Sequence, residues 1–128
     1  MIDAIVSTED SRFYQHNGFD APRFFKATLK QLLGDNSAGG ASTLSMQVVK
    51  NSFTDASQDS GIKGIIRKFT DIYLAVFKLE KNYTKEEIIE FYVNNHYLGG
   101  NIYGVEEASQ AYFNKSVGEL NLSEATII

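Results

Sequence analysis

Residues 62–76 read "IKGIIRKFTDIYLAV" and carry the strongest structural signal in this chain. Apolar side chains recur at the i, i+3, i+4 spacing of one helix face, at Ile62, Ile65, Ile66, Phe69, Ile72, Tyr73 and Val76. Charged and polar residues fill the positions between them. The pattern predicts an amphipathic helix, and its continuous stripe makes this the expected central and most buried helix.

Helical signals continue on both sides of this segment. Asp20 is a good N-cap and Pro22 is tolerated in a first turn, so a second amphipathic helix is expected from there to Gly34. Further helices are expected from a Ser42 or Thr43 cap to residue 53, after a capping box at 84–87, at about 105–112 and from 122 onward. No segment alternates like a strand. The expected fold is mainly α, in one domain over residues 1–128 whose C-terminal end is truncated.

Composition limits the classes of function. The chain has 128 residues, of which 43% are hydrophobic and 22% charged, as in an ordinary globular domain. Its net charge of −4 argues against a general nucleic-acid binder, which needs a basic face. It has no cysteine, so disulfide and thiolate chemistry are excluded. No apolar run approaches the roughly 20 residues of a spanning helix, and no signal-peptide pattern appears.

The stretch Ser7–Asp20, "STEDSRFYQHNGFD", gathers acidic and aromatic residues near the start of the chain. Glu9 and Asp10 are explained in one way as first-turn acids of a helix capped by Ser7 or Thr8. In the other interpretation, the rings around them form a partly apolar pocket, where the pKa of a carboxyl group rises toward a value useful for proton transfer. His16 is interpreted as a hydrogen-bonded structural histidine.

Two further segments combine polar residues with basic ones. In "GGASTLSMQVVKN", Gly39–Asn51, glycines precede a capped helix, which is a weak signal for an anion site that Lys50 would reinforce. Arg67 and Asp71 are i, i+4 neighbours, so they form either a surface ion pair or part of a pyrophosphate site with Lys68 and Lys50. In the second case Asp71 would orient a sugar or a base.

Five motifs in order then resemble the peptidoglycan glycosyltransferase (transglycosylase) domain of class A penicillin-binding proteins and monofunctional transglycosylases. "EDSRFYQHNGFD" resembles E-D-x-x-F-x-x-H-x-G-x-D, and "GGASTLSMQVVKN" resembles G-x-S-T-I-x-Q-Q with a trailing basic residue. "RKFTDIYLAVFKLE" is similar to R-K-x-x-E-x-x-x-A-x-x-L-E. "KEEIIEFYVNNHYLGG" and "YGVEEASQAYFNKSVGELNLSEA" are similar to the chiefly structural fourth and fifth motifs. The resemblance covers essentially the whole chain.

The resemblance implies a lysozyme-like fold and the polymerisation of lipid II into glycan strands. The new β-1,4 bond forms with inversion, undecaprenyl pyrophosphate leaves, and Glu9 acts as general base. By motif position the implied catalytic residues are Glu9 and Asp71, the substrate-binding ones Ser42, Thr43, Gln47, Lys50, Arg67 and Lys68, and the site-shaping ones Asp10, Phe13, His16 and Gly18. A divalent cation, magnesium or manganese, is implied as a cofactor without an identified site, and moenomycin as a donor-site inhibitor.

The resemblance also implies a setting. The parent protein would act on the outer face of the bacterial plasma membrane. It would have an N-terminal membrane anchor and C-terminal helices absent from this chain, and would work with a transpeptidase domain or other cell-wall synthesis proteins, not with nucleic acid. Residues 55–61, between the second and third motifs, are interpreted either as a flap over the acceptor site or as an ordinary surface loop.

Two positions depart from the motifs, and two other functions remain open. Asp71 stands in place of the usual Glu, and Met46 replaces the first Gln of the second motif, which removes an amide from an expected substrate-contacting helix. A lysozyme-like hydrolase or lytic transglycosylase also uses a catalytic Glu, but it needs no pyrophosphate site. The third candidate is a non-catalytic module that binds lipid II or glycan.

Overall fold

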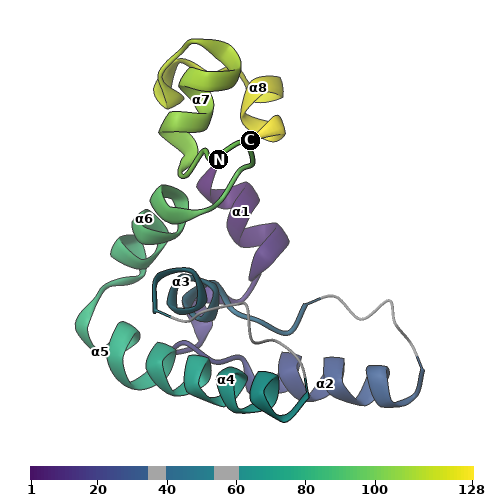
Figure 1. Ribbon diagram of the computed structural model, residues 1–128. Helices are drawn as coiled ribbons and strands as arrows, with labels where there is room; N and C mark the ends of the chain where they lie inside the picture. The colour runs from purple at the N-terminus through teal and green to yellow at the C-terminus, as the bar shows by residue number, and fades with distance from the viewer. Residues whose placement is uncertain (35–39, 54–60) are drawn as a thin grey trace.

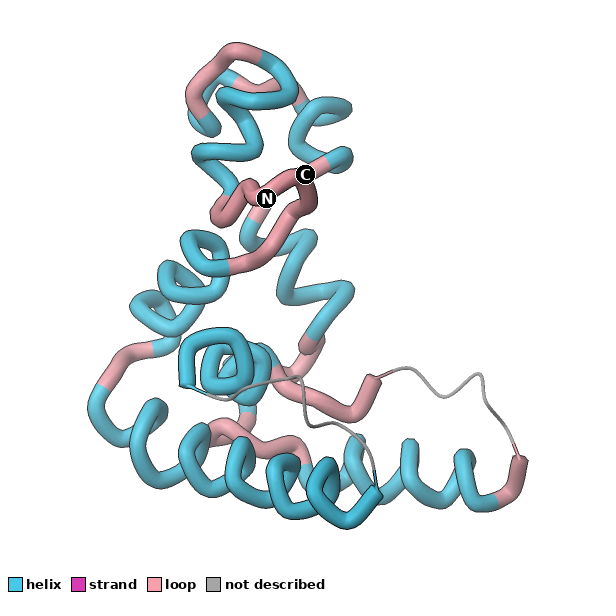
Figure 2. The backbone as a smooth tube through the Cα atoms, in the orientation of Figure 1, coloured by secondary structure: helices cyan, strands magenta, loops and turns pink. Residues whose placement is uncertain are grey.

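A computed structural model of the chain describes residues 1–34, 40–53 and 61–128 (Figures 1 and 2). The mainly α prediction is confirmed, and the isolated Tyr97–Tyr103 bridge is the only β pairing within those ranges. The α-helices are α1 (Ile2–Glu9), α2 (Ala21–Leu32), α3 (Leu44–Phe53), α4 (Gly61–Leu74), α5 (Glu80–Asn82), α6 (Lys85–Asn95), α7 (Val105–Phe113) and α8 (Leu122–Ile127). Phe13–Gln15 and Val117–Glu119 form 3-10 turns, and Ala75–Leu79 continues α4 as a π-helix.

The buried centre of the fold is α3. Leu44, Met46, Val48 and Val49 of this helix are buried, and they pack with Phe13, Ala75, Leu79, Ile88 and Ile89. Helix α3 contacts α4, α6 and the π-helical segment. In Figure 1, α2 and α4 lie at the bottom of the molecule, while α7, α8 and both chain ends lie at the top.

The expectation that residues 62–76 form the most buried helix is wrong. The helix exists as α4, but the side chains of Ile62, Ile65, Ile66, Phe69 and Tyr73 are between 54% and 77% exposed. Its inward face instead carries Asp71, which is 2% exposed, followed one turn later by buried Ala75. Periodicity shows which residues share a helix face, but it does not show what covers that face.

The predicted helix starts have the expected caps. A carboxylate oxygen of Asp20 accepts the Arg23 backbone N–H at 3.0 Å, and Thr43 Oγ1 accepts that of Met46 at 3.2 Å. Thr84 and Glu87 form a reciprocal capping box at the start of α6. The interpretation of Glu9 as a first-turn acid is wrong, because Glu9 is the last residue of α1.

Two further predictions concern residues 55–61 and the absence of a membrane-spanning helix. The segment interpreted as a flap or loop, 55–61, lies outside the described residues except for Gly61, which begins α4. Within the described ranges, no helix has the length and apolar character needed to cross a bilayer.

Candidate active site

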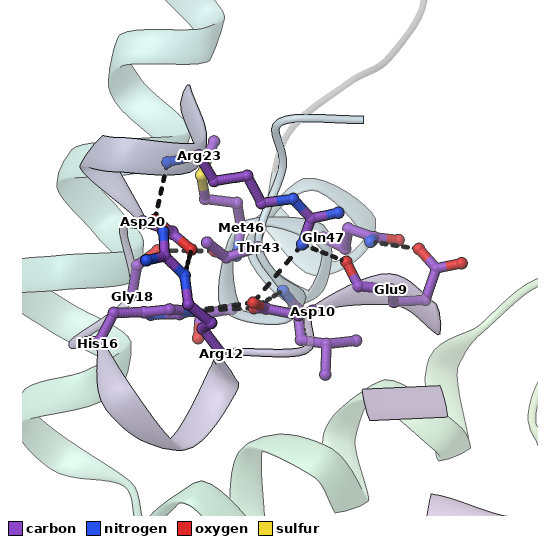
Figure 3. A network of polar contacts seen from close by, with 12 residues as sticks. Glu9, Asp10, Arg12, His16, Gly18, Asp20, Arg23, Thr43, Met46 and Gln47 are labelled. Atoms are coloured by element: carbon purple, nitrogen blue, oxygen red, sulfur yellow. Dashed lines mark hydrogen bonds and ion pairs between the residues drawn. The ribbon is translucent and has the colours of Figure 1, made fainter. Parts of the chain in front are cut away.

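Glu9 stands at the C-terminal end of α1 and faces α3. The side-chain amide of Gln47 donates a hydrogen bond to Glu9 Oε2 at 3.0 Å, and Arg23 Nη1 donates to the Glu9 backbone carbonyl at 2.8 Å (Figure 3). One carboxylate oxygen and the backbone are thus held by two different helices. This fixes the position of a potential base at the surface of the helix core.

Asp10 connects the end of α1 to the start of α3. Its carboxylate is fully buried, and its Oδ2 accepts the Leu44 backbone N–H at 3.0 Å. His16 Nε2 lies 3.0 Å from the same oxygen, and Arg23 Nη1 lies 3.7 Å from Oδ1 (Figure 3). Asp10 therefore shapes the site from inside the protein, and His16 is its hydrogen-bonded partner.

Phe13 and Gly18 shape the turn between Asp10 and α2. Phe13 is fully buried, and Lys85 Nζ lies 4.2 Å from the centre of its ring. Gly18 has a φ of +88°, and a Cβ there would lie 2.9 Å from the backbone carbon of Ala75. Only glycine fits this position without strain.

The side chains around Glu9 line three neighbouring cavities. The first, here called the polar cavity, has a volume of about 520 Å³ and is lined by Thr8, Glu9, Arg23, Gly40, Ser42, Gln47, Lys50, Asn51 and His96. The second, the basic pocket, has about 60 Å³ and is lined by Ser42, Met46, Gln47, Lys50, Arg67, Lys68 and Asp71. Ser42, Gln47 and Lys50 line both, so the polar cavity leads from Glu9 to the basic residues.

The third cavity, the apolar cavity, lies on the other side of Glu9. It has a volume of about 390 Å³ and lies among α1, α6 and the C-terminal residues, with Ile5, Tyr92, Val93 and Leu98 in its wall. Burial raises the pKa of Tyr92 to about 12, and the negative charge of Glu9 adds to this rise. Glu9 thus borders a partly apolar space, but its apolar wall comes from α1, α6 and the C-terminal residues and not, as expected from the sequence, from the rings of residues 7–20.

The basic pocket contains an ion pair that is not on the surface. Arg67 Nη1 lies 2.9 Å from Asp71 Oδ2, and the side chain of Asp71 is only 3% exposed. Lys68 Nζ donates a hydrogen bond to Ser42 Oγ. The surface interpretation of this pair is therefore wrong, and the interpretation as part of a pyrophosphate site stays a prediction.

Two residues of the second motif differ from expectation. Thr43 is fully buried, its hydroxyl donates to the Gly18 carbonyl at 2.7 Å, and it caps α3, so its side chain is engaged in supporting the fold. Met46 is 2% exposed and packs in the core beside the basic pocket. Replacing the usual glutamine by Met46 therefore removes an amide from the buried wall of that pocket and not from an open surface.

Asp20 anchors the loop below the site. Burial raises its pKa, but the Arg23 backbone N–H and the Arg12 guanidinium outweigh burial and hold the pKa below its ordinary value. Arg12 Nε donates to Asp20 Oδ2 at 2.8 Å. Asp20 thus stays charged and keeps the start of α2, including Arg23, next to Glu9.

Sequence reasoning missed Arg23, Thr8 and His96 as cavity residues. No periodic pattern marks them, although His96 is one of only two histidines in the chain. For a metal, no group of three or more His, Asp and Glu side chains comes together in the parts of the chain that the structure describes. These side chains do not form a cage for the predicted divalent cation.

Comparisons with known proteins all point to the same family. The sequence profile of the transglycosylase family matches residues 1–128. Penicillin-binding protein 1A of Escherichia coli (strain K12) is 39% identical over 128 residues, which are 100% of this chain and 14% of that protein. Penicillin-binding protein 1A of Clostridium tetani is 44% identical over 130 residues, 98% of this chain and 16% of that protein. Penicillin-binding protein 1F of Bacillus subtilis is 35% identical over 126 residues, 98% of this chain and 17% of that protein. The chain thus spans about one sixth of these relatives.

Proposed function

Because this chain belongs to the transglycosylase family, we propose that it polymerises lipid II into peptidoglycan glycan strands. The observation that carries the proposal is the continuity between Glu9 and the basic pocket. Ser42, Gln47 and Lys50 line both the polar cavity next to Glu9 and the basic pocket. A base and a pyrophosphate site in one cleft suit a glycosyl transfer with a pyrophosphate leaving group.

Glu9 acts as the general base in the proposed reaction. It removes the proton from the 4-hydroxyl of the acceptor lipid II while that oxygen attacks the anomeric carbon of the donor. A β-1,4 bond forms with inversion, the bond from the anomeric carbon to the pyrophosphate oxygen breaks, and the proton passes from Glu9 to solvent. Gln47 keeps the carboxylate in place through its hydrogen bond to Oε2.

The basic pocket stabilises the leaving group. Lys50, Arg67 and Lys68 line it and supply positive charge where undecaprenyl pyrophosphate becomes more negative in the transition state. Asp71 holds the Arg67 guanidinium through the 2.9 Å ion pair. In this scheme Asp71 positions Arg67, and Ser42 positions Lys68.

The role of Asp71 is testable with two variants. Asp71→Asn removes the charge that orients Arg67, so we expect the polymerisation rate to fall by about ten- to a hundredfold. Asp71→Glu restores the residue usual in this motif and keeps the charge, so we expect a rate within a few-fold of wild type. Initial rates with labelled lipid II measure both. Equal rates for Asp71→Asn and wild type would contradict the positioning role.

A hydrolase or lytic transglycosylase is the second candidate. It would also use Glu9, but it has no chemical need for the pocket formed around Arg67, Lys68 and Asp71. Incubating the parent-length protein with labelled lipid II in detergent separates the two, since a polymerase lengthens the product and a hydrolase shortens preformed glycan. A non-catalytic module would do neither. Inhibition of polymerisation by moenomycin would support a donor site of the transglycosylase type.

The exposed apolar face supports work at a membrane. The stripe of Ile62, Ile65, Ile66, Phe69 and Tyr73 on α4, together with Phe25 and Leu29 on α2, leaves large apolar side chains in contact with water. Such a face suits the surface of a bilayer, where the lipid-linked substrate resides. We place the reaction on the outer face of the bacterial plasma membrane.

Vesicle binding tests this placement. The double variant Ile65→Asp/Phe69→Asp puts two charges on the stripe, so we expect binding to phospholipid vesicles to weaken at least about tenfold. Leu122→Asp is the matched control, because Leu122 is 82% exposed and its helix, α8, lies at the other end of the molecule from α4 (Figure 1). A co-sedimentation assay measures both. If the double variant bound as tightly as Leu122→Asp, α4 would not be the membrane-facing helix.

A further inference from the structure

The backbone of His96 is held on both sides at the end of α6. Its N–H donates to the Tyr92 carbonyl at 3.0 Å, and its carbonyl accepts the Gly104 N–H at 2.9 Å. Gly104 has a φ of +84°, and a Cβ there would lie 2.6 Å from the Asn94 carbonyl oxygen. The turn that carries His96 is therefore tightly packed, and the imidazole is placed by fixed backbone.

The two ring nitrogens of His96 have different environments. The ring packs on Tyr92, with ring centres 5.0 Å apart and the planes at 34°. Nδ1 is buried and has no hydrogen-bond partner among the described residues. Nε2 is not one of the buried atoms that lack a partner. A neutral imidazole carries one proton, and a buried N–H without a partner is rarer than a buried acceptor without one. The proton is therefore expected on Nε2, which makes this atom a donor.

His96 stands where two of the cavities meet. Within residues 1–34, 40–53 and 61–128, Thr8, Glu9 and His96 alone line both the polar cavity and the apolar cavity. A ligand that extends from one cavity to the other must pass between Glu9 and this imidazole. Since Nδ1 is the buried nitrogen, such a ligand would meet the imidazole at Nε2.

We propose that His96 binds the acceptor saccharide. Its Nε2–H donates a hydrogen bond to a hydroxyl or N-acetyl oxygen of the sugar whose 4-hydroxyl faces Glu9. The inference rests on the proposed polymerase function, and it adds a binding residue from the fourth motif to the proposed base and leaving-group residues, which come from the first three. His96 takes no proton in this role. It holds the acceptor in line with the base.

Nitrogen NMR tests the proposal without relying on activity. The chain has only two histidines, so protein labelled with 15N-histidine gives two sets of ring signals. His16, whose Nε2 is engaged by Asp10, serves as the internal reference. At about pH 8, where free imidazole is neutral, we expect Nε2 of His96 to carry the proton. Addition of soluble GlcNAc–MurNAc disaccharide should shift the His96 signals and leave those of His16 unchanged. A proton on Nδ1, or no shift of His96, would overturn the proposal.

Kinetics of paired variants give an independent readout. His96→Phe keeps a ring against Tyr92 but removes the donor, so we expect the KM for lipid II to rise about fivefold with kcat little changed. His96→Gln retains an N–H near the position of Nε2 and should restore the KM. Asn95→Ala is the control, because Asn95 is the neighbouring residue on α6 and its side chain bonds the Phe91 carbonyl outside the cavities.

The outcomes distinguish the role of His96 from the proposed polymerase function. Polymerisation by wild type with an unchanged KM in His96→Phe would overturn the role of His96 and leave the proposed function standing. Equal losses in His96→Phe and His96→Gln would also overturn it, because they would indicate a purely structural role. No polymerisation by wild type would refute the proposed function, and the acceptor assignment with it, whatever the disaccharide does to the NMR spectrum.

Discussion

Glu9→Gln is expected to reduce polymerisation of lipid II by about a hundred- to ten-thousandfold, the contribution typical of a positioned general base. The amide has almost the same shape as the carboxylate, and its oxygen still accepts the hydrogen bond that Gln47 donates to Oε2 at 3.0 Å. What it loses is the ability to accept a proton from the acceptor 4-hydroxyl. The loss should therefore appear in kcat, with the thermal unfolding midpoint close to that of wild type.

The control for this variant is Glu90→Gln on α6. It makes the same chemical change at an exposed position that lines none of the cavities around Glu9. We expect wild-type rates from it in the same assay. If Glu9→Gln instead polymerised lipid II as fast as Glu90→Gln, the general-base mechanism would be wrong, and the family motif would serve another purpose in this chain.

Asp10→Asn is expected to lower the free energy of unfolding by about 3 kcal/mol, because it breaks a buried and charged hydrogen-bond cluster. The carboxylate accepts the Leu44 N–H and contacts His16, and Arg23 lies 3.7 Å away. An amide cannot present two acceptor oxygens to these groups. One donor is left without a partner inside the protein, and the negative charge opposite Arg23 disappears.

Urea denaturation followed by circular dichroism measures this loss. Asp3→Asn provides the comparison, because Asp3 also lies on α1 but is exposed, so its replacement should change stability by less than about 0.5 kcal/mol. Asp10→Asn should also lower the polymerisation rate, since Asp10 fixes the chain next to Glu9. An unfolding midpoint equal to that of Asp3→Asn would show that Asp10 does not connect α1 and α3 as described.

Local signals predicted the helices well but not their environments. The caps at Asp20 and Thr84 depend on side chains within three residues of each other, so the sequence alone contains the whole interaction. The burial of α4 depends on which elements cover it, and these lie elsewhere in the chain. Its apolar stripe therefore correctly indicated a helix face and wrongly indicated the protein interior.

In the candidate site, too, local motifs were read correctly and contacts between distant segments were missed. The motifs singled out Glu9, Gln47 and Lys50, and in the structure these three residues line one cavity. The motifs did not reveal that the Thr43 hydroxyl donates a hydrogen bond to the carbonyl of Gly18, which lies in a loop 25 residues earlier in the chain. Nor did they mark His96, because a single residue in a turn has no periodicity and reaches the site only through the packing of α6 on α3.

The burial of α3 has a consequence for how activity responds to heat. Gln47 and Lys50 of the site project from the same helix whose Leu44, Val48 and Val49 form the centre of the core. Sites on loops often lose their shape well below the melting temperature, because loops open locally at little cost. Here Gln47 and Lys50 cannot move away from the site without opening the core itself. Inactivation and global unfolding should therefore occur together on heating, as a single cooperative transition.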